Sequence, residues 1–548
     1  MKPLRLILSI AACLIIAAGA YFWANSLMAS LYDFRSPLKD TPPAPGLALG
    51  QPNTRRAVLV LIDALRYDTS TKTDVMPFLN QLRAQGASAT MHSRTPSYSA
   101  PGYSVLMTGA WPDLSDGPAM NPEGKDLPRT WTQDNLFTAA HTAGLKTAVS
   151  GYFWFQGLIP QNAVDASFYT EGEDKAADVD VVNAALPWLA GDYQLILIHI
   201  DQVDYAGHHE GGARSPNWDA AANRADTLLQ EFVSHLDLKL DTVIVFSDHG
   251  QIDAGGHGGQ DPIVLVEPFV MAGAGVAPGK YGDISMVNVA PTVAALLGTN
   301  IPATDQGSVL TNMLTLTPEQ KDAIQSALSQ QQTRLLQLYS KAINVPMRGA
   351  TGDLSVASAQ SMLEAAKTSR LNGERIPRFV IVALALLVIL YFPWKNRSVS
   401  LAWISAGAVI YIALFNFRYG ILAGRTYSLS SVTGADDIIL FTAATALAAF
   451  ALAWLVVFLW RGLFRQSPGQ AARDAFTFTF VTLFLASLPA LWSFAWNGLL
   501  VGWTLPDLGS MFLGFLAILQ TLLIAAAGLL LAGVSAGIAA MAGKQKSN

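Results

Sequence analysis

Short apolar runs recur along the first 300 residues and alternate with segments of helical periodicity. The runs lie at 57–62, 146–150, 194–200, 242–246 and 263–271, and the helical patterns include 76–85, 219–238 and 286–297. Apolar runs rich in β-branched residues that alternate with helices are typical of a mostly parallel sheet covered on both faces. We therefore expect an α/β domain over residues 57–315.

The pattern changes twice after residue 315. Two polar helical patterns, 318–343 and 356–368, predict a helical stalk over residues 316–376. Five apolar blocks follow, at 379–394, 399–417, 438–460, 475–496 and 510–541. Because a helix needs about 20 apolar residues to cross a bilayer, these blocks predict an all-α, five-helix transmembrane domain over 377–548.

The N-terminus supplies one more apolar block. Lys2 and Arg5 precede the uncharged residues 6–24, whose length favours a retained signal anchor over residues 1–30. Small residues at 24–30 loosely resemble a cleavage site, so removal as a signal peptide is the alternative. The proline-rich stretch 36–54 then makes residues 31–56 a linker.

Loop charges orient the predicted membrane spans. Positive residues in four segments fall on one side of a six-span arrangement: Lys2 and Arg5; Lys395 and Arg397; Arg461, Arg465 and Arg473; Lys544 and Lys546. Two groups fall on the other side: Lys367, Arg370, Arg375 and Arg378; Arg418 and Arg425. By the positive-inside rule, four segments against two favour an integral membrane protein with cytoplasmic termini. We expect the α/β domain outside the cytoplasm, on the periplasmic face of a bacterial inner membrane.

Composition agrees with this division and narrows the classes of partner. The chain has 548 residues, of which 51% are hydrophobic, too long for one domain and too apolar for a purely soluble protein. Its net charge of -5 and the lack of a basic stripe interleaved with aromatics argue against a nucleic-acid partner. The single cysteine, Cys13, rules out a disulfide within the chain.

Side chains that can bind a metal ion or act as a nucleophile follow the predicted strands. They are Asp63, Ser99, Asp204, His208, Asp248, His249 and His257. Carboxyl ends of parallel strands meet at one edge of a sheet, and carboxylate and imidazole groups suit zinc or manganese. Asp204 and His208 are four apart, so one helical turn would place both on one face. Three aspartates, three histidines and a hydroxyl are the inventory of a two-metal site with a nucleophile.

The motifs around these residues resemble a known family. DALRYD, MPFLNQL, PSYSAPG, LMTG, VDYAGH, SDHG and GGHGG occur here in the order found in the alkaline phosphatase superfamily. The resemblance covers residues 57–307 and is strongest to the glycosylphosphatidylinositol ethanolamine phosphate transferases, whose domain is of the type I phosphodiesterase/nucleotide pyrophosphatase kind. It implies an alkaline phosphatase-like fold. It also implies two divalent ions, zinc with manganese as the alternative, one held by Asp63, Ser99, Asp248 and His249 and the other by Asp204, His208 and His257.

The resemblance makes Ser99 the nucleophile, although the transferases usually present threonine at this position and alkaline phosphatases present serine. The expected activity is the transfer of a phosphoethanolamine-type head group from a phospholipid, such as phosphatidylethanolamine, to a lipid or glycan acceptor outside the cytoplasm. Hydrolysis of phosphate esters, with water as acceptor, is the alternative. A binding or scaffold protein on an inactive hydrolase fold is disfavoured because none of the seven residues is missing. Oxyanion stabilisation is expected from the metals and the Ala100 backbone N–H.

Overall fold

The computed structural model describes residues 3–347, 353–395 and 398–545, so Lys2, Arg397 and Lys546 of the charge pattern lie outside the described residues. The chain forms two compact units. We call Tyr32–Leu371 with Gly502–Leu505 the α/β unit, and Met1–Leu31, Asn372–Val501 and Pro506–Asn548 the membrane unit.

The α/β unit is built on one eight-stranded sheet of order β4-β3-β5-β1-β6-β7-β2-β8. Its strands are β1 (Arg56–Ile62), β2 (Ala87–His92), β3 (Thr147–Tyr152), β4 (Ala166–Thr170), β5 (Leu195–Ile200), β6 (Asp241–Phe246), β7 (Val266–Gly273) and β8 (Gly279–Ser285). Only β7 runs antiparallel to its neighbours β6 and β2, while every other pair in this sheet is parallel. The mostly parallel sheet predicted from the apolar runs is confirmed.

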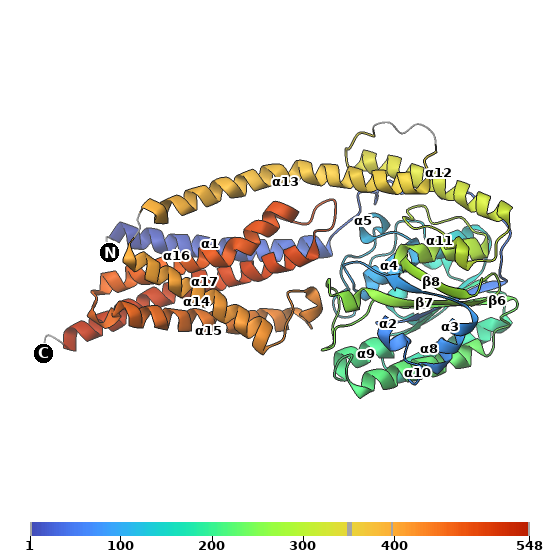
Figure 1. The fold of residues 1–548 in the computed structure, drawn as a ribbon, viewed down its shortest axis with the longest axis horizontal. Helices are drawn as coiled ribbons and strands as arrows, with labels where there is room; N and C mark the ends of the chain where they lie inside the picture. The colour runs from blue at the N-terminus through green and yellow to red at the C-terminus, as the bar shows by residue number, and fades with distance from the viewer. Residues whose placement is uncertain (1–2, 348–352, 396–397, 546–548) are drawn as a thin grey trace. The chain divides into compact units, whose positions relative to one another are not determined.

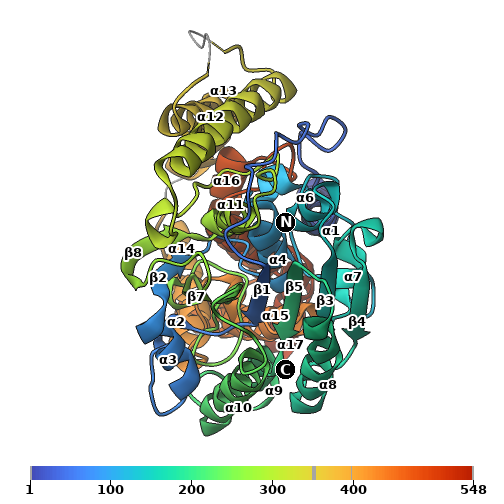
Figure 2. The same cartoon turned by 90° about the vertical axis from the view of Figure 1, so that its right-hand side faces the viewer.

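Helices cover both faces of this sheet (Figure 1, Figure 2). Successive residues of a strand point to opposite faces, and all seven residues of β1 are buried. Leu59 and Leu61 pack in a core with α4 (Ser99–Thr108), α6 (Leu136–Thr142), α7 (Trp154–Leu158) and α11 (Val289–Leu297). Val58 and Val60 pack in a second core with α3 (Pro77–Gln85), α8 (Lys175–Ala185) and α10 (Pro216–Val233). The central strands are thus shielded on both sides, and their ends are where polar groups can meet.

Two longer helices follow the sheet. α12 (Pro318–Ala342) begins with a capping box between Thr317 and Gln320, and α13 (Val356–Lys395) is continuous over 40 residues. The sequence separated a stalk helix at 356–368 from a membrane span at 379–394, and the structure joins them. The residues between them, SRLNGERIPR, include Gly373 and Pro377, which disfavour a helix, so local propensity did not predict this continuity.

The segment expected as a linker and the start of α13 both pack within the α/β unit. Leu38 lies in one buried cluster with Leu335 and Tyr339 of α12 and Leu363 of α13. Asp116, at the end of α5 (Pro112–Ser115), anchors the segment further. It binds the guanidinium of Arg35 at 2.7 Å and accepts a hydrogen bond from the Ser36 N–H.

Five helices within the described ranges are long and apolar enough to cross a membrane. They are α1 (Pro3–Tyr32), α14 (Val399–Asn416) with the turn after it, α15 (Ala435–Arg461), α16 (Pro468–Asn497) and α17 (Leu508–Gln545). The last part of α13 is not among them, so the six-span count stays a prediction. Small residues allow close packing here, since a Cβ on Gly528 would lie 2.3 Å from Thr479 Cγ2 and one on Gly514 would lie 2.4 Å from Ser493 Cβ.

Candidate active site

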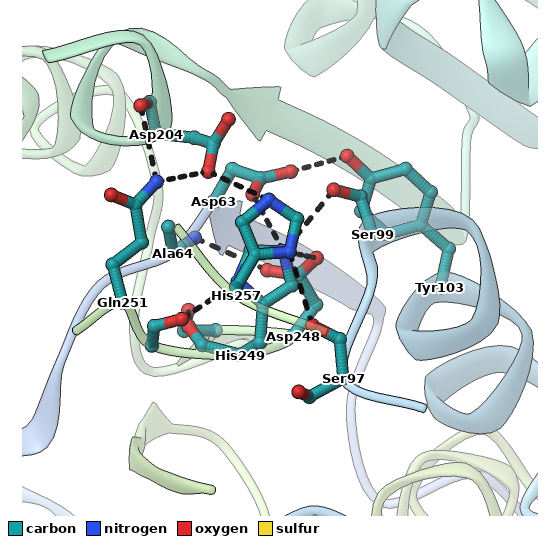
Figure 3. Close-up of polar contacts among 12 residues, drawn as sticks. Asp63, Ala64, Ser97, Ser99, Tyr103, Asp204, Asp248, His249, Gln251 and His257 are labelled. Carbon is teal, nitrogen blue, oxygen red and sulfur yellow. Dashed lines mark hydrogen bonds and ion pairs between the residues drawn. The ribbon is translucent and has the colours of Figure 1, made fainter. Parts of the chain in front are cut away.

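Three adjacent strands, β5, β1 and β6, place five of the predicted residues at one edge of the sheet. Asp63 directly follows β1, and Asp248 and His249 follow β6. Asp204 and His208 lie on α9 (Gln202–His209), which begins directly after β5, while Ser99 is the first residue of α4. All seven predicted site residues converge there, and Figure 3 labels six of them.

One half of the cluster surrounds the Nε2 atom of His249. This atom lies 3.1 Å from Ser99 Oγ, 3.3 Å from Asp248 Oδ2 and 3.5 Å from Asp63 Oδ1. The chain turns sharply after Asp63, because Ala64 has a φ of 58°, and the Ala64 N–H then donates to Asp248 Oδ1 at 3.3 Å. The ends of β1 and β6 are therefore tied together at this point.

The other half consists of Asp204, His208 and His257. The predicted helical turn is present, and His208 Nε2 lies 3.5 Å from Asp204 Oδ2. His257 Nε2 lies 2.9 Å from His208 Nε2 and 3.6 Å from Asp204 Oδ1. The ligand atoms of Asp63, Asp204 and His249 also lie within 4.8 Å of one another, so the two halves adjoin.

The side chains in both halves fit cations. Asp63 Oδ1 and Asp248 Oδ2 are buried without a hydrogen-bond partner, although buried oxygens are normally paired. The Nδ1 atoms of His249 and His257 lie 3.1 Å from the carbonyls of Gly250 and Ser97, so each must donate there and leave a lone pair on Nε2. Lone pairs and unpaired carboxylate oxygens that converge on one place are what a divalent metal requires.

The pKa shifts of these side chains are also what a cation-binding site requires. Burial, together with the nearby carboxylate of Asp63, raises the pKa of Asp248 well above its usual range. Burial acts in the same sense on Asp204, but the nearby His208 counters it, and the pKa of Asp204 is lowered to about 2. Burial and the neighbouring His249 hold the pKa of His257 well below its usual value, so its imidazole is neutral and able to act as a ligand.

Four residues that the sequence did not single out complete the site. Tyr103 and His199 contact Asp63, and Gln251 donates to Asp204 Oδ1 at 2.5 Å. Asn121 Oδ1 accepts the Ala100 N–H at 3.0 Å, so this N–H donates to a side chain here, and its role as an oxyanion donor stays a prediction. Of the four, His199 could have been noticed in the sequence, since it is a lone histidine inside the apolar strand LILIHI.

Comparison with known proteins then gives the family. The model of the type I phosphodiesterase/nucleotide pyrophosphatase family matches residues 57–400. The chain belongs to this family. Membership of the type I phosphodiesterase family makes it an enzyme of phosphoester chemistry, and the match includes all of the sheet except Arg56 and all seven predicted site residues.

Its curated relatives include several larger transferases. The chain is 27% identical over 383 residues to the human GPI ethanolamine phosphate transferase 3 catalytic subunit, covering 60% of this chain and 34% of that protein. It is 25% identical over 300 residues to GPI ethanolamine phosphate transferase 2 of Candida albicans, covering 49% and 33%. The chain thus spans about a third of the length of these relatives. The five apolar helices of its described residues make this member of the type I phosphodiesterase family an integral membrane protein.

Solved structures with a similar arrangement include wild-type alkaline phosphatase PafA, with a TM-score of 0.39 at 11% identity, covering 48% of this chain and 100% of that one. Human ectonucleotide pyrophosphatase/phosphodiesterase 5 has a TM-score of 0.38 at 14% identity, covering 44% and 95%.

Proposed function

We propose that this protein transfers a phosphoethanolamine-type head group from a phospholipid to a lipid-linked glycan through a covalent intermediate on Ser99. The observation that carries this proposal is the contact of the buried Ser99 hydroxyl with His249, inside a cluster of aspartates and histidines at the carboxyl edge of the sheet. A buried hydroxyl surrounded by ligand-type side chains can serve as an activated nucleophile.

In this proposal Asp63, Ser99, Asp248 and His249 hold one divalent cation, and Asp204, His208 and His257 hold a second. When bound, such ions lower the pKa of a coordinated hydroxyl and neutralise charge on the phosphoryl oxygens. Zinc is the proposed metal, with manganese as the alternative, because both accept carboxylate and imidazole ligands.

The reaction we propose has two displacements at phosphorus. Ser99 Oγ loses its proton and attacks the phosphorus of phosphatidylethanolamine, and the bond to the diacylglycerol oxygen breaks as that oxygen takes up a proton. A hydroxyl of the acceptor then loses its proton and attacks the phosphorus of the Ser99 ester, and Ser99 leaves with its hydroxyl restored. The similar transferases and the apolar helices of the membrane unit support a lipid donor and a lipid-linked acceptor. We further propose that the α/β unit works outside the cytoplasm, on the periplasmic side of a bacterial inner membrane.

Hydrolysis is the second candidate, favoured by the serine at position 99, where the resembling transferases usually carry threonine. Incubation of the purified protein with head-group-labelled phosphatidylethanolamine in mixed micelles separates the two. Transfer predicts labelled protein with little free phosphoethanolamine until a glycosylphosphatidylinositol precursor is added, after which the label moves to that lipid. Continuous release of free phosphoethanolamine without the precursor would establish hydrolysis instead. Ser99→Ala serves as the control for labelling at this residue.

A further inference from the structure

A buried hydrogen-bond network lies behind Asp63, on the side away from the cluster. Asp63 Oδ2 accepts a hydrogen bond from the Tyr103 hydroxyl and lies 2.9 Å from His199 Nε2. The Tyr103 hydroxyl also lies 2.9 Å from His199 Nε2. None of the three residues is more than 1% exposed, so water does not compete for these contacts.

The hydrogen-bond pattern fixes the proton on His199. The backbone N–H of Tyr152 donates to His199 Nδ1 at 3.4 Å, so Nδ1 carries the lone pair and Nε2 carries the proton. His199 therefore donates to Asp63. Asp63, His199 and Asp201 have ligand atoms close enough for a further metal group. Because both nitrogens of His199 are already committed, we do not assign this imidazole to a metal.

The two oxygens of Asp63 consequently differ. Oδ2 has two donors, whereas the buried Oδ1 has no hydrogen-bond partner and faces His249 Nε2 at 3.5 Å. We propose that Tyr103 and His199 are positioning residues that hold Asp63 as a one-oxygen ligand for the cation beside Ser99. This inference rests on the proposed function, in which Asp63 is a metal ligand.

Packing keeps the two donors in place. The ring of Phe155 stacks on Tyr103 with centroids 4.6 Å apart and meets His199 edge-on at 5.4 Å. A Cβ on Gly151 would lie 2.6 Å from His199 Cβ, so glycine at 151 is what allows the imidazole to sit there. Neither donor can swing away without disturbing a buried ring.

The network also links the metal ligand to the nucleophile. Tyr103 lies four residues after Ser99 on α4, so one helical turn carries both (Figure 3). The same rigid element thereby sets the position of the Ser99 hydroxyl and the orientation of the Asp63 carboxylate. A displacement of either group by about 1 Å would lower the catalytic rate greatly, since the rate depends steeply on the positions of the reacting groups.

Zinc titration of the purified full-length protein against a chromophoric chelator tests the proposal. Tyr103→Phe removes one donor and keeps the ring, and His199→Gln offers an amide donor in place of the imidazole. Residues that orient metal ligands typically contribute about 10- to 100-fold in affinity. We expect Tyr103→Phe to weaken one of two zinc sites within this range and His199→Gln to weaken the same site less than His199→Leu does. The second zinc site should stay at wild-type affinity in all three variants.

Tyr152→Phe is the matched control. It removes another buried phenol hydroxyl at the same edge of the sheet, one that donates to Glu173 at 2.7 Å, and we expect both zinc sites to keep wild-type affinity. Wild-type affinity at both sites in Tyr103→Phe and in His199→Leu would overturn the proposal. If a leucine at 199 prevents folding, unchanged affinity in Tyr103→Phe and His199→Gln overturns it equally.

The titration also separates this inference from the proposed function. Missing phosphoethanolamine transfer together with the predicted zinc pattern would reject the transferase and keep the positioning role. Asp63→Asn with two wild-type zinc sites would show that Asp63 is not a ligand and would reject both the ligand assignment and the positioning role.

Discussion

Ser99 Oγ lies 3.1 Å from Nε2 of His249, and this contact joins the start of α4 to the loop after β6. Because His249 Nδ1 is occupied by the Gly250 carbonyl, the serine hydroxyl is the donor in this contact. The nucleophile therefore lies beside a proposed metal ligand before any substrate arrives, which limits the reorganisation needed for attack.

Replacing Ser99 by alanine should abolish the covalent intermediate and most of the turnover. The expected loss is about 10³-fold or more if covalent catalysis determines the rate, by the scale of nucleophile deletions. Zinc content and folding should stay close to wild type, because the hydroxyl is a small part of the cluster. Turnover of labelled phosphatidylethanolamine and mass spectrometry of the trapped protein measure both effects.

Ser99→Thr is the matched variant and should retain activity, because the resembling transferases use threonine at this position. Wild-type turnover in Ser99→Ala would mean that water attacks directly and that no enzyme ester forms.

Gly102→Ala should damage the site through packing alone. A Cβ at position 102 would lie 2.9 Å from Asp248 Cβ and 3.1 Å from its carbonyl oxygen, so Asp248 must move. Alanine stabilises a helix interior by about 1 kcal/mol relative to glycine. Overpacking a core costs about 1–3 kcal/mol, so we expect a small net loss of stability and a large loss of zinc affinity. Gly282→Ala in β8, where nothing lies within 4 Å, is the control. Equal zinc affinity in the two variants would contradict the prediction.

The sequence predicted the parts of the fold that are buried and apolar. The runs at 57–62, 194–200 and 242–246 became β1, β5 and β6, the three strands that carry the site. β2, β4 and β8 have the sequences ASATMH, ASFYT and GKYGDIS, which offer no continuous apolar run, and β4 and β8 are edge strands with one unpaired side. Such strands form because a neighbour offers hydrogen bonds, and that partner is not visible in local sequence.

The sequence likewise predicted only some of the residues that form the site. All seven predicted residues converge because the motifs that contain them directly follow the central strands or begin the helices beside them. Tyr103, Asn121 and Gln251 stayed hidden, because their roles depend on hydrogen bonds between segments far apart in the chain. Tyr103 and Asp63, for example, are 40 residues apart. A spacing rule finds residues that share one turn or one motif, and it cannot find such pairs.

Gln251→Leu should weaken the metal held by Asp204, His208 and His257. Gln251 is buried, and its amide donates to Asp204 Oδ1 and to the Asp204 carbonyl, which fixes the carboxylate that both histidines approach. Leucine keeps most of the volume and removes the donor. We expect about 10- to 100-fold lower affinity at one zinc site, and a different site from the one that Tyr103→Phe affects. Weakening of the same site in both variants would contradict the division of ligands.

A cytoplasmic C-terminus is the topological prediction. Two of the positive residues that count against it are engaged within the membrane unit, since Arg375 lies 3.6 Å from the Trp496 ring centroid and Arg425 binds Asp437 at 2.7 Å. A charge paired with a carboxylate or an aromatic face is a weaker topological signal than a free one. A fluorescent protein that folds only in the cytoplasm, fused after residue 548, should fluoresce. Fluorescence from the same reporter inserted between residues 124 and 125 instead would reverse the assignment.

The carboxyl group of Asp178 should make stability depend on pH between about 4 and 6. This side chain is 1% exposed and accepts the N–H groups of Asp201 and Gln202, at the start of the helix that bears Asp204. Burial raises the pKa of Asp178 to about 6 from its usual value of 3.8, although both N–H donors oppose the rise. The folded state therefore binds this proton more tightly than the unfolded state does.

Its stabilising effect is complete below about pH 4 and is lost as the pH rises to about 6, and the difference is about 3 kcal/mol at 1.36 kcal/mol per pKa unit. Asp178→Asn removes the titration and keeps one acceptor oxygen. We expect the free energy of unfolding of the wild type, relative to Asp178→Asn, to fall by about this amount between pH 4 and pH 7. Denaturant unfolding in detergent with a metal chelator present measures it, since other carboxyl groups titrate alike in both proteins. Parallel pH curves for the two proteins would show that the folded and unfolded states hold this proton equally.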